Sequence, residues 1–144
     1  MVLGHRIAPE AVAGFAADAG IVIAHNANFD RKFAERYWPL FEQKAWACSA
    51  TEVDWRKYAL DGSRLEYLLA GVGLFHQAHR AVDDCPALIE ILVSTLPSID
   101  KPAFAVLLEH ARRKTMHIWA QQSPFELKDE LKKRGYRWND GADG

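Results

Sequence analysis

The sequence predicts an α/β fold, because helical and strand patterns alternate along its first 97 residues. The chain has 144 residues, of which 49% are hydrophobic and 26% charged, as in ordinary globular domains. These values argue against disorder, collagen-like repeats and coiled coils. Only two segments are convincing strands, which is too few to bury helices on both faces of a sheet. We therefore expect that strands are missing or are supplied by another chain.

Charge, cysteine content and hydrophobic runs exclude several classes of protein. The formal net charge is −1, so the chain lacks the basic surface that holds duplex DNA nonspecifically. Cys48 and Cys85 are too few for a disulfide framework and lack the spacing of a metal site. This cysteine content favours a reduced, cytoplasmic setting. Since no apolar run could span a bilayer and the first residues do not resemble a signal peptide, we expect no membrane partner.

The first 45 residues predict two helices that flank a strand. A helix is expected over 9–19, where Pro9 suits the first turn and Gly20 the position after the last turn. The apolar run 21–24 predicts a buried strand. Asn26 and Asn28 are good N-cap residues for a second helix over 29–41. The apolar stripe of that helix consists of Phe29, Phe33, Tyr37 and Leu40.

Residues 46–97 predict one more strand and three more helices. The expected segments are a strand over 46–49, a short helix over 52–58, a helix that opens at 63–66 and runs to about 70, a loop over 76–80 and a long helix over 81–96. Ser63 and Glu66 have the spacing of a capping box, which would open the helix that runs to about 70. Pro97 would stop the long helix.

The last third of the chain predicts a connecting helix and a small basic appendix. The connecting segment covers 98–113 and contains a helical pattern from Pro102 to Arg113. Residues 114–144 predict a β-α-β module, with strands over 115–121 and 136–138 and a helix over 123–134. The basic residues of this region are Arg112, Arg113, Lys114, Lys128, Lys132, Lys133, Arg134 and Arg137.

Asp30 is predicted to lie where α/β proteins gather their ligands. It follows the strand over 21–24 and would occupy the first turn of the next helix, beside the carboxyl edge of the sheet. An aspartate in a first turn also complements the helix dipole, and on local sequence alone this structural role is the more frequent one.

Asp84 is predicted to point inward from the helix over 81–96. Steps of three and four from Asp84 reach Leu88, Ile91 and Leu92. The same steps from Asp83 reach Ala87, Glu90 and Ser94, which are mostly polar. A buried carboxylate needs a partner, which a bound cation, a salt bridge or a hydrogen bond would provide. From the preceding loop, His79 could reach the same site and serve as a general base, because its pKa lies near neutral pH.

Two short strings resemble motifs of a known enzyme family. Residues 25–30 read HNANFD and resemble the second motif of DEDDh-type 3′–5′ exonucleases, which include DNA polymerase proofreading subunits (DnaQ-like) and RNase T-like enzymes. Residues 79–84 read HRAVDD and resemble the third motif, a histidine followed five positions later by an aspartate. The resemblance covers roughly residues 1–97 and implies an RNase H-like exonuclease fold.

The resemblance also implies a reaction and a site. Asp30 and Asp84 would be catalytic carboxylates that bind metal, and His79 would activate water. The family uses two Mg²⁺ or Mn²⁺ ions, about 4 Å apart, and these ions prefer oxygen ligands. The substrate would be the 3′ end of single-stranded DNA or RNA, and the product a nucleoside 5′-monophosphate. Further substrate contacts are expected from His25, Asn26, Asn28, Phe29 and Arg80.

The first motif of the family is absent from these 144 residues. That motif is an Asp-x-Glu on the first strand, and the chain contains no Asp-x-Glu. Residues 52–54 read Glu-Val-Asp, which is the reverse order, and they lie between the other two motifs. The first three strands of the family, on the order of 50 residues, would be missing with the motif. We therefore expect an N-terminally truncated exonuclease domain that is weak or inactive alone.

The appendix resembles a small module that accompanies nucleic-acid enzymes, with the pattern PF-x-x-KD-x-LK-x-x-G-x-x-W. Charge and stacking by its last residues would suit a single strand of nucleic acid. The candidate contact residues are Arg134, Tyr136, Arg137 and Trp138. The alternative is that Trp138 closes a small core under the helix.

Three interpretations of the chain remain open at this point. It is a fragment or shortened form of an exonuclease, or a non-catalytic domain, derived from the same fold, that binds nucleic acid or another protein. In the third interpretation two chains complete one sheet as a homodimer or by exchange, since a truncated sheet has a bare edge. That assembly still needs an Asp-x-Glu from a different polypeptide. The presence of Asp30, His79 and Asp84 together favours the first interpretation.

Overall fold

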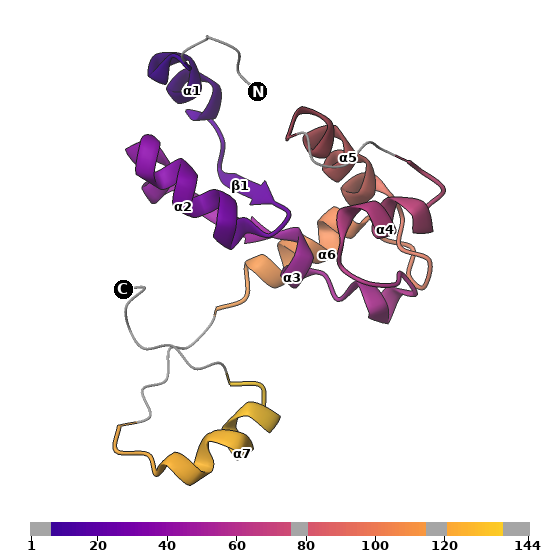
Figure 1. Ribbon diagram of the computed structural model, residues 1–144. Coiled ribbons are helices and arrows are strands. Elements are labelled where there is room, and N and C mark those ends of the chain that lie inside the picture. Colours follow the sequence, from indigo (N-terminus) through magenta and orange to yellow (C-terminus); the bar gives the residue numbers. More distant parts are fainter. Residues whose placement is uncertain (1–6, 76–80, 115–120, 137–144) are drawn as a thin grey trace. The chain divides into compact units, whose positions relative to one another are not determined.

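The structure, a computed structural model, describes residues 7–75, 81–114 and 121–136 (Figure 1). Its internal contacts divide the chain into two units, Met1–Arg113 and Lys114–Gly144. The two units are described separately below.

The first unit contains a two-stranded parallel sheet within its described residues. Strand β1 (Ile21–Ala24) pairs with strand β2 (Ala45–Cys48), and Ala24 lies opposite Cys48 at the carboxyl end. The strands predicted over 21–24 and 46–49 are confirmed, although β2 begins one residue early. The expected full burial of β1 is wrong, because all four of its residues are only half-buried. Among the described residues β2 alone pairs with β1, so one edge of β1 stays open.

Helices α1 and α2 come directly before and after strand β1. Helix α1 (Pro9–Ala16) begins at the predicted proline and ends three residues earlier than predicted. Helix α2 (Ala27–Tyr37) is followed by the 3-10 helix η1 (Pro39–Gln43), because Pro39 cannot continue an α-helix. Asn26 occupies the N-cap position of α2, but its side chain makes no capping hydrogen bond. Its φ of 72° lies in the left-handed region, which asparagine adopts more readily than most residues.

The predicted apolar stripe of α2 is exposed within the first unit. Phe29 is 62% exposed, Phe33 is 51% exposed and Tyr37 is 62% exposed. The rings of Phe29 and Phe33 lie against each other, with centroids 4.9 Å apart. This spacing along a helix is typical of a surface that covers a sheet. The described strands do not cover the stripe.

The hydrophobic core lies among helices α4 (Leu65–Gly71), α5 (Ala81–Val93) and α6 (Ala103–Ala111), which gather together in Figure 1. These helices confirm the helix predicted from the capping box at 63–66 to about 70 and the helices predicted over 81–96 and 102–113, with ends that differ by one to three residues. The largest fully buried side chains of the unit belong to Val53, Leu68, Leu69, Ile91, Leu96 and Leu107. Each such side chain contributes about 1.5–3 kcal/mol through its removal from water.

Two local predictions between β2 and α4 need correction. The short helix expected over 52–58 is divided into α3 (Ser49–Glu52) and the 3-10 helix η2 (Trp55–Tyr58). The capping box is wrong, because the N-cap of α4 is Arg64 and no side chain caps it. The backbone carbonyl of Ser63, one residue earlier, instead accepts a hydrogen bond from His25.

The second unit contains the 3-10 helix η3 (Phe125–Leu127) and helix α7 (Lys128–Lys133). They confirm the helix predicted over 123–134, and Gly135 follows its end with a φ of 86°, a conformation that favours glycine. The strands predicted over 115–121 and 136–138 lie almost entirely outside the described residues. Across the described parts of both units, no helix has the length and apolar character needed to cross a membrane.

Candidate functional site

The carboxyl ends of β1 and β2 lie side by side and lead into polar residues. Ala24 pairs with Cys48, so the next residues, His25 and Ser49, leave the same edge of the sheet. His25 is half-buried, whereas Ser49 is completely buried. In parallel sheets this edge is where ligands are usually bound.

His25 connects three segments through both of its ring nitrogens. Its Nδ1 lies 2.8 Å from the Ser49 hydroxyl oxygen, and its Nε2 lies 2.5 Å from the backbone carbonyl oxygen of Ser63. The indole Nε1 of Trp55 donates to the carbonyl oxygen of Ser49 at 2.8 Å in the buried interior. The imidazole therefore links the end of β1 to α3 and to the start of α4.

Asp30 and Asp84 both act electrostatically on His25. Burial lowers the pKa of His25, while the hydrogen bond to Ser63 and the charges of Asp30 and Asp84 partly raise it. Burial raises the pKa of Asp30, and a backbone hydrogen bond and the charge of His25 oppose that rise. The charges of both carboxylates selected from the sequence thus act on one imidazole at the carboxyl edge of the sheet.

The two predicted carboxylates occupy the first turns of two helices. Asp30 is exposed in the first turn of α2, and Asp84 is half-buried in the first turn of α5. Leu88, Ile91 and Leu92, on the face predicted for Asp84, are buried. The predicted contrast with Asp83 is wrong in terms of burial, because Asp83 is half-buried too and Ala87 on its face is buried.

The remaining predicted contact residues of the first unit divide into two groups. Asn26, Asn28 and Phe29 are exposed at the N-terminus of α2, within four residues of Asp30 in sequence. His79 and Arg80 lie outside the described residues. The geometry of the predicted general base relative to the two carboxylates therefore stays a prediction.

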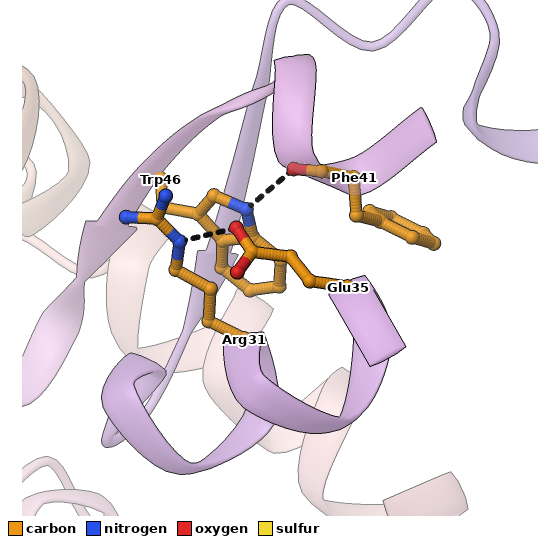
Figure 2. Close-up of polar contacts among 4 residues, drawn as sticks. All are labelled: Arg31, Glu35, Phe41 and Trp46. Carbon is orange, nitrogen blue, oxygen red and sulfur yellow. Dashed lines mark hydrogen bonds and ion pairs between the residues drawn. The ribbon is translucent and has the colours of Figure 1, made fainter. Parts of the chain in front are cut away.

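Figure 2 shows two polar contacts, one within α2 and one between β2 and η1. Arg31 follows Asp30 in sequence and pairs with Glu35, one helical turn further on, at 2.5 Å. Trp46 on β2 donates from its indole nitrogen to the carbonyl oxygen of Phe41 in η1 at 3.1 Å. The second bond ties η1 to the sheet, whereas the exposed ion pair contributes little to stability.

The contact residues predicted in the second unit are only partly described. Arg134 pairs with Glu130 on α7 at 2.6 Å, and the side chain of Tyr136 is half exposed. Arg137 and Trp138 lie outside the described residues.

The described residues do not fit a complete divalent-metal site. No group of three or more histidine, cysteine, aspartate or glutamate side chains lies close enough to hold a metal ion in the described ranges. Asp30 and Asp84 have the hard oxygen atoms that Mg²⁺ and Mn²⁺ prefer, but two carboxylates are few for such an ion. Any complete site would therefore need donors beyond the described side chains.

Sequence reasoning did not select Ser49 or Cys48, which also stand at this edge. Burial acts to raise the pKa of the Cys48 thiol, but hydrogen bonds from the Thr51 side chain and from the backbone of Ala27 and Ala50 lower it overall. Their position at the end of an apolar strand is the sequence feature that could have identified Cys48 and Ser49 as site residues. Ser49 matters most here, because it fixes a ring nitrogen of His25.

Comparison with known proteins identifies one family. The family model RNase T, described as exonuclease, matches residues 7–92, which is more than half of the chain. The matched range contains β1, β2, Asp30 and Asp84. No curated protein and no solved structure matches the chain.

Replacement of Asp30 by asparagine is expected to stabilise the fold at neutral pH. Because burial raises the folded-state pKa of Asp30 above its ordinary value, the ionised carboxylate costs stability above that pKa. In urea unfolding at pH 7, Asp30→Asn should have a higher midpoint than the unmodified chain. The difference should shrink as the pH falls through the folded-state pKa and vanish below the ordinary pKa of aspartate.

Glu109→Gln is the matched control, with the opposite sign. A hydrogen bond and the charge of Lys101 lower the pKa of Glu109, so its ionised form stabilises the fold and the substitution should lower the midpoint at pH 7. An Asp30→Asn midpoint at or below that of the unmodified chain at pH 7 would contradict the raised pKa of Asp30.

Proposed function

The chain belongs to the exonuclease family, and from this membership we propose that it forms part of a 3′–5′ exonuclease acting on single-stranded DNA or RNA. Membership makes it a hydrolase of nucleic acids at the level of the family. The observation that supports the finer proposal is that Asp30 and Asp84, in the first turns of α2 and α5, both act electrostatically on His25 at the carboxyl edge of a parallel sheet.

The proposed catalytic residues are Asp30, Asp84 and His79. Members of the family generally use divalent metals, and Mg²⁺ or Mn²⁺ is the cofactor we propose for the completed site. Asp30 and Asp84 would supply its carboxylate oxygens from the first turns of α2 and α5. His79 would accept a proton from the water that attacks the terminal phosphodiester, and the shortened strand would leave with a 3′-hydroxyl.

The N-terminus of α2 offers a suitable surface for the terminal nucleotide. The exposed ring of Phe29 can stack on a base, since every base has an apolar face. The exposed amides of Asn26 and Asn28 can donate to sugar and phosphate oxygens, and Arg80 would neutralise a phosphate. These contacts tolerate either DNA or RNA.

We propose that further strands complete this domain and bring the Asp-x-Glu that these 144 residues lack. Two features support the proposal: the apolar strand β1 is half-buried with one open edge, and Phe33 and Tyr37, the stripe residues of α2 that follow Phe29, are exposed. Both features are what a larger sheet would cover. The strands would come from the same polypeptide or, by pairing in trans or in a homodimer, from another chain.

The second unit is proposed to contact the single strand beyond the terminal nucleotide. Tyr136 is available for stacking, and Trp138 would extend the stack. Arg134 can exchange its exposed pair with Glu130 for a phosphate at small cost, and Arg137 would add a second charge. The alternative of a non-catalytic binding domain receives no support from the comparisons.

The chain alone is expected to show little exonuclease activity. With Mg²⁺ or Mn²⁺, it should release few nucleotides from 3′-labelled single-stranded DNA or RNA, because its described carboxylates do not make a complete metal site. Asp84→Ala is the test variant, and Asp83→Ala, which removes an equally half-buried neighbour, is the matched control. Robust release that is lost in Asp84→Ala and kept in Asp83→Ala would show that no further carboxylates are needed.

Single-strand binding is expected to depend on Phe29. Loss of one base-stacking ring should weaken binding of a labelled oligonucleotide about tenfold in fluorescence anisotropy. Phe15→Ala is the matched control, because Phe15 is 93% exposed on α1 and lies away from the start of α2 in sequence. Equal affinities for Phe29→Ala and Phe15→Ala would argue against a substrate surface at the start of α2.

A further inference from the structure

A buried hydroxyl group stands at the carboxyl edge of the sheet. Ser49 is the buried polar residue of the described part of the chain, with no exposed surface. Its hydroxyl oxygen lies 2.8 Å from Nδ1 of His25 and 3.5 Å from the carbonyl oxygen of Ala24. Buried hydroxyl groups are costly to leave without a partner, so this contact is a strong constraint on the local structure.

The contacts of His25 determine which ring nitrogen carries the proton. The carbonyl oxygen of Ser63 can only accept, so Nε2 of His25 must donate to it. In the neutral ring Nδ1 is then an acceptor, and the Ser49 hydroxyl donates to it. Both ring nitrogens are thus engaged within the protein. Two bonds to different segments fix the orientation of the ring.

We propose that His25 and Ser49 are positioning residues, which hold the turn before α2 against the start of α4. His25 lies just before α2, which carries Asp30 in its first turn. Ser63 lies just before α4, and α4 packs against α5, which carries Asp84. The contact chain Ser49–His25–Ser63 therefore sets how the segment with Asp30 lies relative to the segment with Asp84.

This assignment gives His25 a role different from direct contact with substrate. A substrate group could reach a ring nitrogen only by displacing Ser49 or the Ser63 carbonyl. The positioning role rests on the proposed function in one respect: only if Asp30 and Asp84 are catalytic does their relative position matter for activity. The contacts themselves are independent of nuclease activity, so their tests need no substrate.

The first test is the protonation pattern of the His25 ring, read by two-bond ¹H–¹⁵N NMR of the full chain. The expected spectrum of the unmodified chain shows a protonated Nε2 and an unprotonated Nδ1 that accepts a hydrogen bond. Ser49→Ala should shift the Nδ1 signal, because it removes the hydroxyl donor. Ser63→Ala and Ser94→Ala should not, since Ser63 contributes only its carbonyl and the Ser94 hydroxyl, just after α5, donates to the Ile91 carbonyl of that helix.

The second test is amide hydrogen exchange at both ends of the contact chain. In Ser49→Ala, the amides of Phe29 at the start of α2 and of Leu68 in α4 should exchange about fivefold faster, which corresponds to one lost hydrogen bond. The amide of Ala105 in α6 reports general destabilisation and should change less. His25→Phe, which keeps a ring but loses both bonds, should accelerate Phe29 and Leu68 further.

Several outcomes would overturn the proposal. They are a protonated Nδ1 in the unmodified chain, an Nδ1 signal unmoved by Ser49→Ala, equal acceleration at Ala105, or acceleration at only one of the two segments. A chain that passes both tests but fails to bind oligonucleotides would keep the positioning role and lose the proposed function. A chain that binds oligonucleotides but fails either test would keep the proposed function and lose the positioning role of His25 and Ser49.

Discussion

The parallel pairing of β1 with β2 determines where His25, Ser49 and the start of α2 lie. The register places Ala24 opposite Cys48, so His25 and Ser49 leave the sheet together and form their hydrogen bond. The same pairing places the start of α2, with Asp30, beside the edge that α4 and α5 approach. If β2 were shifted by one residue, its side chains would change faces and the contact between the imidazole and the hydroxyl would be lost.

The two sides of this sheet differ in how completely their apolar residues are buried. On the side of α4, α5 and α6, a dense apolar core stabilises the fold, and its residues are almost completely buried. Along the open edge of β1, apolar strand residues are half-buried and the aromatic stripe of α2 is exposed. At its carboxyl end, β1 leads to carboxylates that act on one imidazole and that, among the described residues, make no complete metal site. Strand β1 therefore adjoins both the uncovered apolar surface and the carboxylates, and the proposed further strands with Asp-x-Glu would address both.

Sequence patterns predicted the elements well where local periodicity decides them. Strand β1 and helices α5 and α6 follow from apolar runs and helical spacing, and the family is now confirmed by the model match over 7–92. Capping was predicted poorly: α4 begins one residue later than the capping box requires, with Arg64 as its N-cap and no side chain capping it. Exposure of the stripe on α2 could not be predicted, because periodicity identifies an apolar face but not the element that packs against it. The role of Ser49 depends on a contact between residues 24 positions apart, which no local pattern reveals.

The central claim is that Asp30 and Asp84 face one ion site at the carboxyl edge of the sheet. Paramagnetic broadening by Mn²⁺ tests this claim most directly, because it reports distance from the ion at every amide of a ¹⁵N-labelled chain. The account predicts that the amides in the first turns of α2 and α5 broaden together and first, at millimolar Mn²⁺, because few carboxylates bind weakly. Broadening that begins at the acidic residues of α7, or that reaches only one of the two first turns, would contradict it.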